Sequence, residues 1–302
     1  MSSAGPEPDP GPGAVSSPIA VTGATGHLGG GVAAALSAAG VRQRLIVRSP
    51  ERAPVLPAAS VARASYDDAG AVRAALAGVD TVFMVSGAEE PDRLAGHRTF
   101  VDAAVAAGGS RLVYTSFFAA APDATFTLAR DHWHTEAHIR ASGLRFTFLR
   151  NNLYADQLPL FAGPQGLLRG PAGDGRVSAV ARRDVVDVAV AVLLAARSGP
   201  SEHDGRTYDL TGPQSLSLAD AARIITEVTG RATRYQDETL EQAYRSRSGY
   251  GAAGWQLDAW VSTYTAIATG ELAPVTGDVP LVAGHPATSL AALLAGPDGR
   301  SG

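Results

Sequence analysis

Short apolar segments alternate with amphipathic segments through the first half of the chain. The apolar segments are rich in Val, Ile, Leu and Phe and predict strands over residues 18–23, 41–49, 60–66, 80–87, 110–118 and 144–152. The segments between them predict helices, most of which end near a glycine, over residues 27–40, 68–79, 97–109 and 130–143. Strands that are apolar throughout are typical of a parallel sheet covered on both faces, so we expect a doubly wound, Rossmann-type α/β fold.

The pattern loosens after Asn152. A stretch rich in Gly and Pro over 161–176 predicts a loop. Residues 183–199 and 217–230 predict helices, of which the second begins with a Ser-x-x-Asp capping signal. Between these helices, residues 205–212 predict a strand, and the rest of the chain predicts mainly further helices.

These patterns divide the chain into four parts. We expect a disordered tail over 1–17, because this stretch is rich in Pro and Gly, and a Rossmann domain over 18–152. A small, mainly helical substrate lobe over 153–295 would interleave with the last elements of the sheet, and residues 296–302 would form a flexible tail. The lobe is expected over the carboxyl edge of the sheet, where folds of this kind bind their ligands.

The stretch VTGATGHLGG, residues 21–30, joins the first predicted strand to the first predicted helix. A plain turn would need one glycine, whereas Gly23, Gly26 and Gly29 follow each other at intervals of three. In this context the first glycine allows a tight turn, the second lets a pyrophosphate approach the backbone, and the third lets the helix pack against the strand. The amides at the start of the helix would face the phosphates. We therefore expect a dinucleotide cofactor on Thr22, Gly23, Thr25, Gly26, His27, Leu28 and Gly29.

The end of the second predicted strand indicates which dinucleotide binds. Sites for NAD usually carry an acidic residue there, which bonds the ribose 2′-hydroxyl. This chain has Arg48, followed by Ser49 and Arg52. A guanidinium suits a 2′-phosphate, so we expect NADP(H) on Arg48 and Ser49. If Arg48 only lies in solvent at the end of the strand, NAD remains a possible cofactor.

The cofactor is expected to continue past the ends of three further strands. Ser86 and Gly87 close the fourth strand, where the ribose of such cofactors normally passes. Thr115 and Ser116 close the fifth strand, and the backbone at Asn151, after the sixth, would border the nicotinamide.

Composition excludes several kinds of chemistry. The chain contains neither cysteine nor lysine, which excludes disulfides, thiolate nucleophiles and lysine Schiff bases. The net charge of −4 argues against a nucleic-acid partner, and no apolar run approaches the roughly 20 residues that span a bilayer. Residues 1–17 have neither the basic start nor the apolar block of a signal peptide, so we expect a cytoplasmic protein.

Four stretches, TGATGHLG, IVRSPERA, YTSFF and HTEAHIRASGLRFTFLRNNLY, together resemble the atypical short-chain dehydrogenase/reductases. The chain is most similar to their NmrA-like group, and within it to the type-2 NAD(P)H:quinone oxidoreductases, over roughly residues 18–295. The resemblance implies a Rossmann domain, an NADPH site and a substrate cleft under the C-terminal lobe.

The chain departs from the wider superfamily at its catalytic residues. Orthodox members use a serine with a Tyr-x-x-x-Lys pair, and only the serine has a counterpart here, at Ser116. His132 lies where related plant ether reductases place a lysine, and the resemblance to the quinone-reductase branch matches it as a histidine. In the family an aspartate commonly ends the third strand and touches adenine. Ser65 stands there in this chain, which weakens the expectation of an adenine contact at this position.

Hydride transfer requires little of the protein beyond placing the nicotinamide against its acceptor. A ketone becomes an alkoxide that benefits from a positioned acid, whereas a quinone becomes a weakly basic anion that solvent can protonate. His132, Tyr154 and Ser116 are the candidate catalytic residues, and His132 has an unperturbed pKa suited to proton donation. The alternatives are a surface position for His132 and core packing for Tyr154. His132, His134 and His138 lack a metal-binding motif, so we expect no metal.

We therefore expect an NADPH-dependent oxidoreductase that transfers hydride to a quinone or a conjugated, polycyclic carbonyl compound, with a role in secondary metabolism as an open option. A regulator that senses NADP without turnover is the main alternative, followed by a non-redox isomerase or cyclase on the same fold. The expected partner is a small aromatic or quinone-like molecule, and a homodimer is left open.

Overall fold

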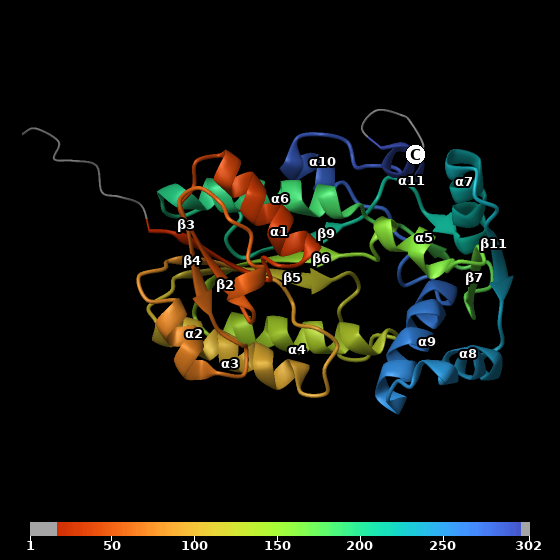
Figure 1. The fold of residues 1–302 in the computed structure, drawn as a ribbon, viewed down its shortest axis with the longest axis horizontal. Helices are drawn as coiled ribbons and strands as arrows, with labels where there is room; N and C mark the ends of the chain where they lie inside the picture. The colour runs from red at the N-terminus through yellow and green to blue at the C-terminus, as the bar shows by residue number, and fades with distance from the viewer. Residues whose placement is uncertain (1–16, 297–302) are drawn as a thin grey trace, which may run out of the picture.

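The computed structural model describes residues 17–296, and its centre is a seven-stranded sheet (Figure 1). The strands lie in the order β3-β2-β1-β4-β5-β6-β9, and every neighbouring pair is parallel. Their bounds are β1 Ile19–Thr22, β2 Gln43–Val47, β3 Ala59–Arg63, β4 Thr81–Met84, β5 Arg111–Phe117, β6 Arg145–Asn151 and β9 Arg206–Leu210. The strand order doubles back between β1 and β4, as in the doubly wound fold predicted from the sequence, which is confirmed.

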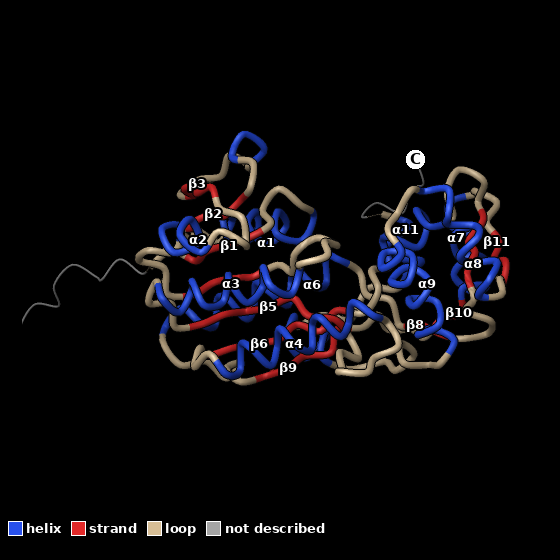
Figure 2. Tube along the Cα trace, turned by 90° about the horizontal axis from the view of Figure 1, so that it is seen from below, coloured by secondary structure: helices blue, strands red, loops and turns tan. Residues whose placement is uncertain are grey.

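Helices cover both faces of this sheet (Figures 1 and 2). One face carries α1 (His27–Ala38), α6 (Arg182–Ala195) and α10 (Asp278–Ala283). The other face carries α2 (Ala69–Ala75), α3 (Arg93–Ala106) and α4 (Thr127–Ala141).

Alternation along the strands explains why two cores form. Val21 and Phe83 are buried against α1 and α6, whereas Ala20 and Val82, their neighbours in the chain, are buried in the core on the opposite face. Successive side chains of a strand point to opposite faces, so a strand that is apolar throughout supplies both layers.

A smaller lobe lies beyond the carboxyl edge of the sheet, at the right of Figure 1. It has its own apolar core, which includes Leu158, Ile225 and Ile267. Its helices are α5 (Leu158–Phe161), α7 (Leu218–Thr229), α8 (Leu240–Arg247), α9 (Gly254–Ala268) and α11 (Leu290–Ala295). The Ser217–Asp220 capping box that starts α7 confirms the capping signal.

The lobe also contains two small sheets that the sequence did not predict. They pair β7 (Leu167–Gly170) with β11 (Arg234–Asp237), and β8 (Arg176–Val177) with β10 (Leu216–Ser217). The expected loop over 161–176 is therefore wrong, because β7 and β8 lie within it. Each of these strands pairs with a segment far along the chain, and such short strands leave no local periodicity.

The expected tails lie mostly outside the described residues, at 1–16 and 297–302. The domain boundary after Asn152 stays a prediction, and α6 and β9 from the second half of the chain complete the main layers. Among the described residues, no helix has the length and apolar character needed to cross a membrane.

Candidate cofactor and substrate site

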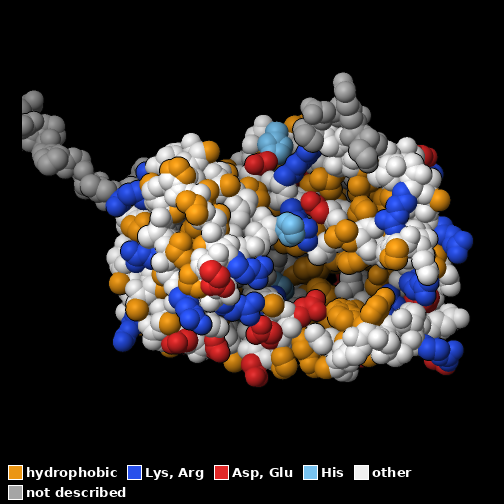
Figure 3. All heavy atoms as spheres, in the orientation of Figure 1, with side chains coloured by type: hydrophobic (Ala, Val, Ile, Leu, Met, Phe, Trp, Pro, Cys, Tyr) orange, Lys and Arg blue, Asp and Glu red, His pale blue; other side chains and the backbone are white. Residues whose placement is uncertain are grey.

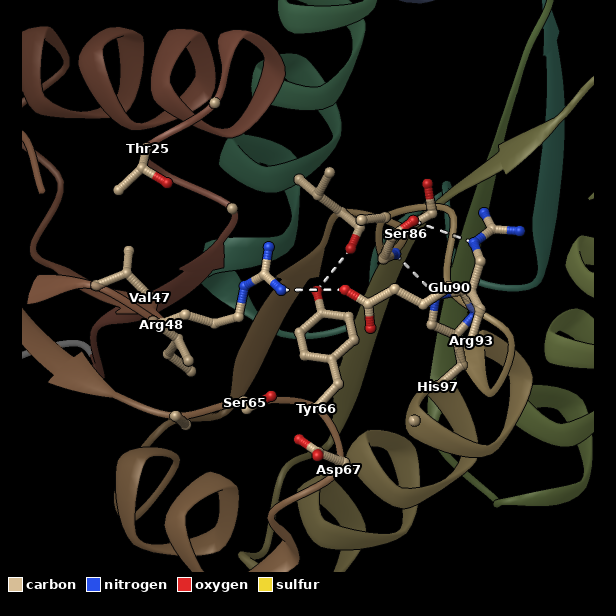
Figure 4. Close-up of a pocket in the computed structure, with 18 of the residues that line it drawn as sticks. Thr25, Val47, Arg48, Ser65, Tyr66, Asp67, Ser86, Glu90, Arg93 and His97 are labelled. Carbon is tan, nitrogen blue, oxygen red and sulfur yellow. Dashed lines mark hydrogen bonds and ion pairs between the residues drawn. The ribbon is translucent and has the colours of Figure 1, made fainter. Parts of the chain in front are cut away.

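A pocket of about 610 Å³ lies at the carboxyl edge of the sheet. The β1–α1 turn, the ends of β2 and β3, and the β4–α3 loop form its walls (Figure 4). Figure 3 shows the molecule hollowed between the sheet layers and the lobe, with charged side chains toward the sheet and apolar side chains on the lobe.

The glycines of the β1–α1 turn meet two separate requirements. Gly23 has φ +63°, a left-handed conformation that favours glycine, and its carbonyl accepts a 2.9 Å hydrogen bond from the Gly26 amide. A Cβ on Gly29 would lie 2.4 Å from the Gly23 carbonyl oxygen, so only glycine lets α1 pack against this turn. A Cβ on Gly26 would meet that oxygen at 3.4 Å, so packing does not require glycine there. Gly26 instead leaves the pocket side of the turn bare.

The start of α1 offers backbone amides to a ligand. Its N-cap is Gly26, and no side chain caps the helix. The first amides of a helix lack intrahelical partners and favour an anion. Gly23, Thr25 and Gly26 line the pocket, and a cofactor pyrophosphate fits this bare, amide-rich edge. His27, Leu28 and Gly29 lie outside the pocket lining, with His27 exposed and Leu28 buried.

Basic and hydroxyl side chains line the β2 end of the pocket. Arg48, Ser49 and Arg52 all lie there, and their contact with a 2′-phosphate stays a prediction. The Arg48 Nη1 donates to the Glu90 Oε1 at 3.1 Å, and both side chains are more than half exposed. Glu90 comes from the β4–α3 loop, so this ion pair reaches across the pocket (Figure 4).

Two threonines predicted as cofactor contacts bond the β4–α3 loop instead. Thr22 Oγ1 accepts a hydrogen bond from the Val85 amide at 2.9 Å, and Thr115 Oγ1 accepts one from the Ser86 amide at 2.8 Å. Both threonines are buried and neither lines the pocket, whereas Ser86 and Gly87 do. Thr22 and Thr115 therefore position the β4–α3 loop, which lines the pocket.

Tyr66 forms the floor of the pocket beneath Arg48 (Figure 4). Its hydroxyl donates to the Val85 carbonyl at 2.6 Å and lies 2.6 Å from Thr22 Oγ1. Burial raises the pKa of this phenol, so it stays neutral. Ser65 and Asp67, its neighbours after β3, also line the pocket.

Gly87 is fixed from both sides by side chains of α3. Its amide donates to His97 Nε2 at 2.8 Å, and its carbonyl accepts from Arg93 Nε at 3.1 Å. Arg93 and His97 both line the pocket, and no sequence motif indicated either of them. His97 Nδ1 lies 2.9 Å from Thr135 Oγ1 on α4, which connects α3 to the neighbouring helix.

His132 is not the surface residue that the sequence left open as an alternative. Its side chain is buried, with Arg93 Nη2 2.8 Å from Nε2 and the Tyr114 hydroxyl 2.9 Å from Nδ1. A guanidinium only donates, so Nε2 accepts and the proton of the neutral ring is on Nδ1. Burial, reinforced by the Arg93 charge, lowers the pKa of His132 well below 6.5. An imidazolium is therefore absent near neutral pH.

Ser116 belongs to a buried ionic cluster. Its Oγ donates to Glu136 Oε1 at 2.7 Å, and Glu136 is fully buried. Arg150 binds both oxygens of the same carboxylate, at 2.8 and 2.7 Å. The Ser116 hydroxyl therefore has a partner within the protein, and its catalytic role stays a prediction.

Asn151 and Tyr154 meet just beyond β6. Asn151 Nδ2 donates to the Tyr154 hydroxyl at 3.2 Å, while Asn151 Oδ1 is buried without a partner among the described residues. Burial raises the pKa of Tyr154, and the Arg182 guanidinium lies 4.9 Å from its ring centroid. The orphaned amide oxygen is suited to accept a hydrogen bond from a ligand at this edge.

Aromatic side chains lie where the sheet meets the lobe. Phe117 packs on Phe126 with ring centroids 4.7 Å apart, and Phe118 is part of the lobe core. Phe161 lies beside a separate hollow of about 310 Å³, which Tyr250 also lines.

Comparisons with known proteins agree with this geometry. The NAD(P)H-binding family matches residues 23–196. An NAD(P)H azoreductase of Xenophilus azovorans is 33% identical, over 90% of this chain and 95% of the relative, and quinone oxidoreductase 2 of Escherichia coli is 31% identical, over 90% and 96%. The crystal structure of the Escherichia coli enzyme with NADPH superposes with a TM-score of 0.80, at 30% identity, over 90% of this chain and 97% of that one. The predicted resemblance to type-2 quinone oxidoreductases is thus confirmed, and the chain belongs to the NAD(P)H-binding family of oxidoreductases.

Proposed function

We propose that this chain is an NADPH-dependent reductase of quinones or similarly conjugated acceptors. The observation that carries the proposal is the pocket, which has a bare, amide-rich turn at Gly26 and a phosphate-suited group at Arg48, Ser49 and Arg52. When bound there, NADPH supplies the hydride. The relatives named for quinone and azo substrates support an acceptor with delocalised electrons.

The acid–base groups of the site favour such an acceptor. His132 is held neutral by burial and by Arg93, and the buried Tyr154 phenol has a raised pKa. The Ser116 hydroxyl donates to Glu136. None of these three candidates is a strong acid poised to protonate an alkoxide. A quinone needs no such acid, since water can protonate the hydroquinone anion.

The test follows the absorbance of NADPH with catalytic amounts of protein and a panel of acceptors. Small quinones and an azo dye should give steady NADPH loss, whereas an isolated ketone should give little. Saturable NADPH binding without turnover of any acceptor would favour the sensing alternative and overturn the reductase proposal. Conversion of a compound without net NADPH loss would instead point to an isomerase or cyclase.

A further inference from the structure

Arg93 is a buried cation on the wall of the pocket. It is 8% exposed, whereas Arg48 and Arg52, the other arginines among the lining residues, are exposed. Its carboxylate partner is Asp131, with Nη1 and Oδ2 3.5 Å apart, and that carboxylate is partly exposed. The charge of Arg93 is thus loosely compensated, in surroundings where a low dielectric strengthens its field.

The placement of Arg93 separates it from the adenosine end of the pocket. Arg48 follows β2, on one side of the glycine turn, and marks the expected 2′-phosphate position. Arg93 bonds Gly87, which follows β4 on the other side of β1, and His132, which packs beside β5 through Tyr114. Figure 4 shows the two arginines on opposite sides of the pocket. A dinucleotide with its pyrophosphate at the turn therefore directs its nicotinamide half toward Arg93.

The hydrogen bonds of Arg93 fix where its charge lies. Nε donates to the Gly87 carbonyl at 3.1 Å and Nη2 to His132 Nε2 at 2.8 Å. A Cβ on Gly87 would lie 3.2 Å from His97 Nε2, so the loop approaches α3 closely. With the 3.5 Å contact from Nη1 to Asp131, these bonds use three of the five N–H groups of a side chain that lines the pocket.

We propose that Arg93 supplies the fixed positive charge at the reacting end of the cofactor. This inference rests on the proposed function. Hydride transfer breaks the C4–H bond of the reduced nicotinamide, and the hydrogen leaves with both electrons of that bond. The nicotinamide is oxidised to a cation, and a quinone is reduced to a hydroquinone monoanion that takes a proton from water. A nearby guanidinium disfavours the cation and stabilises the anion, so it promotes transfer in this direction.

The role predicts a difference between the two cofactor forms that can be measured without turnover. In the wild-type protein, NADP⁺ should bind more weakly than NADPH, because its nicotinamide carries a positive charge. Arg93→Gln removes the guanidinium charge and should lower the ratio of the two Kd values, Kd(NADP⁺)/Kd(NADPH), by about five- to tenfold. A purely structural role would change both Kd values together and leave their ratio unchanged.

Three further variants make the test specific. Arg93→Lys retains the charge and should keep the ratio within about twofold, even if both Kd values rise through the lost Gly87 contact. Asp131→Asn removes the loosely paired carboxylate and should raise the ratio, in the direction opposite to Arg93→Gln. Arg98→Gln removes an exposed charge from the same helix, outside the pocket lining, and should leave the ratio unchanged.

The Kd values are measured by titration calorimetry with NADPH and NADP⁺, alongside steady-state kinetics with a quinone. Arg93→Gln should lower kcat at least about tenfold more than Arg93→Lys does. If Arg93→Gln folds and its Kd ratio equals that of the wild type, the assignment is overturned. If Arg93→Gln does not fold, an unchanged Kd ratio in Asp131→Asn overturns it. A wild-type protein that shows the ratio but reduces no acceptor would refute the reductase proposal while the role of Arg93 in cofactor binding stands.

Discussion

Gly26 and Gly29 are only three positions apart, yet the structure gives a different reason for the glycine at each of them. The Gly29 position is closed by the backbone of the turn, and the Gly26 position is open toward the pocket. The sequence motif predicted both glycines together. The atoms around each Cα distinguish them. Gly29 is needed for folding, and we expect Gly26 to be needed for cofactor binding.

Alanine substitutions at the two glycines should therefore have opposite profiles. Gly29→Ala should cost about 1–3 kcal/mol of unfolding free energy, because its Cβ meets rigid backbone. Gly26→Ala should unfold within about 0.5 kcal/mol of wild type but bind NADPH at least about tenfold more weakly, since the added methyl group would face a pyrophosphate bound at this turn. Urea unfolding and cofactor titration measure the two effects. Equal loss of stability in both variants would contradict this division.

Glu90 would compete with a cofactor 2′-phosphate for Arg48, if the phosphate binds where we propose. Its carboxylate is paired with the same guanidinium that a 2′-phosphate would use, and a phosphate carries about −1.5 to −2 charge. Glu90→Gln should therefore lower the Kd of NADPH about three- to tenfold and leave that of NADH nearly unchanged. Glu89→Gln is the matched control, because Glu89 bonds Trp260 rather than Arg48. A parallel gain for NADH would show that Glu90 acts on the cofactor as a whole and not on its 2′-phosphate.

At the scale of elements, α3 and α4 meet through two buried imidazoles. His97 on α3 bonds Thr135, and His132 on α4 accepts from Arg93. Burial, and then the Arg93 charge, lowers the pKa of His97 to about 3 and that of His132 well below 6.5. Both rings are neutral in the folded protein, but each gains a proton in the unfolded chain below about pH 6.5. The stability of the fold at this pair of helices therefore depends on pH.

The linkage predicts acid destabilisation with a definite sign. Below about pH 6.5 the unfolded chain binds more protons than the folded one, so the unfolding free energy falls by up to about 1.4 kcal/mol per pH unit for each histidine. For His97 the loss continues toward about pH 3. His97→Gln and His132→Gln should flatten this fall in urea titrations between pH 7 and 4. His134→Gln, at an exposed position of α4, should not, and an unflattened slope in both buried variants would refute the linkage.

Sequence patterns predicted the elements whose signals lie within a short stretch of the chain. The strands of the main sheet and the glycine turn are visible because apolar runs, caps and glycines lie close together in the chain. Arg93, His97 and Glu90 were missed, because each acquires its role from a partner far along the chain. The buried surroundings of His132 were missed for the same reason, since the guanidinium beside its ring comes from another helix.

At the scale of the whole molecule, the sheet and the lobe are joined around the pocket. The Thr127 amide at the start of α4 donates to Ser262 Oγ on α9 at 3.2 Å, and Asn152 Nδ2 donates to the Leu272 carbonyl at 3.0 Å. The β4–α3 loop adds a third connection, because Trp260 Nε1 on α9 donates to Glu89 Oε2 at 3.0 Å. Glu89 precedes Glu90, so adjacent residues of one loop contact the lobe and Arg48 at the end of β2.

The Trp260–Glu89 hydrogen bond should therefore position the lobe over the acceptor without affecting the cofactor. Trp260→Phe keeps an aromatic ring but removes the indole N–H, and we expect the KM for a quinone to rise about three- to tenfold while the Kd of NADPH stays within about twofold. Trp255→Phe, on the same helix, is the control and should change neither value by more than about twofold. Stopped-flow measurement of NADPH oxidation, with binding titrated separately, distinguishes the two steps. The β4–α3 loop also lines the pocket that has Arg48 and Arg93 in its walls. A weaker NADPH affinity in Trp260→Phe would therefore show that this hydrogen bond supports the cofactor site and not the acceptor site.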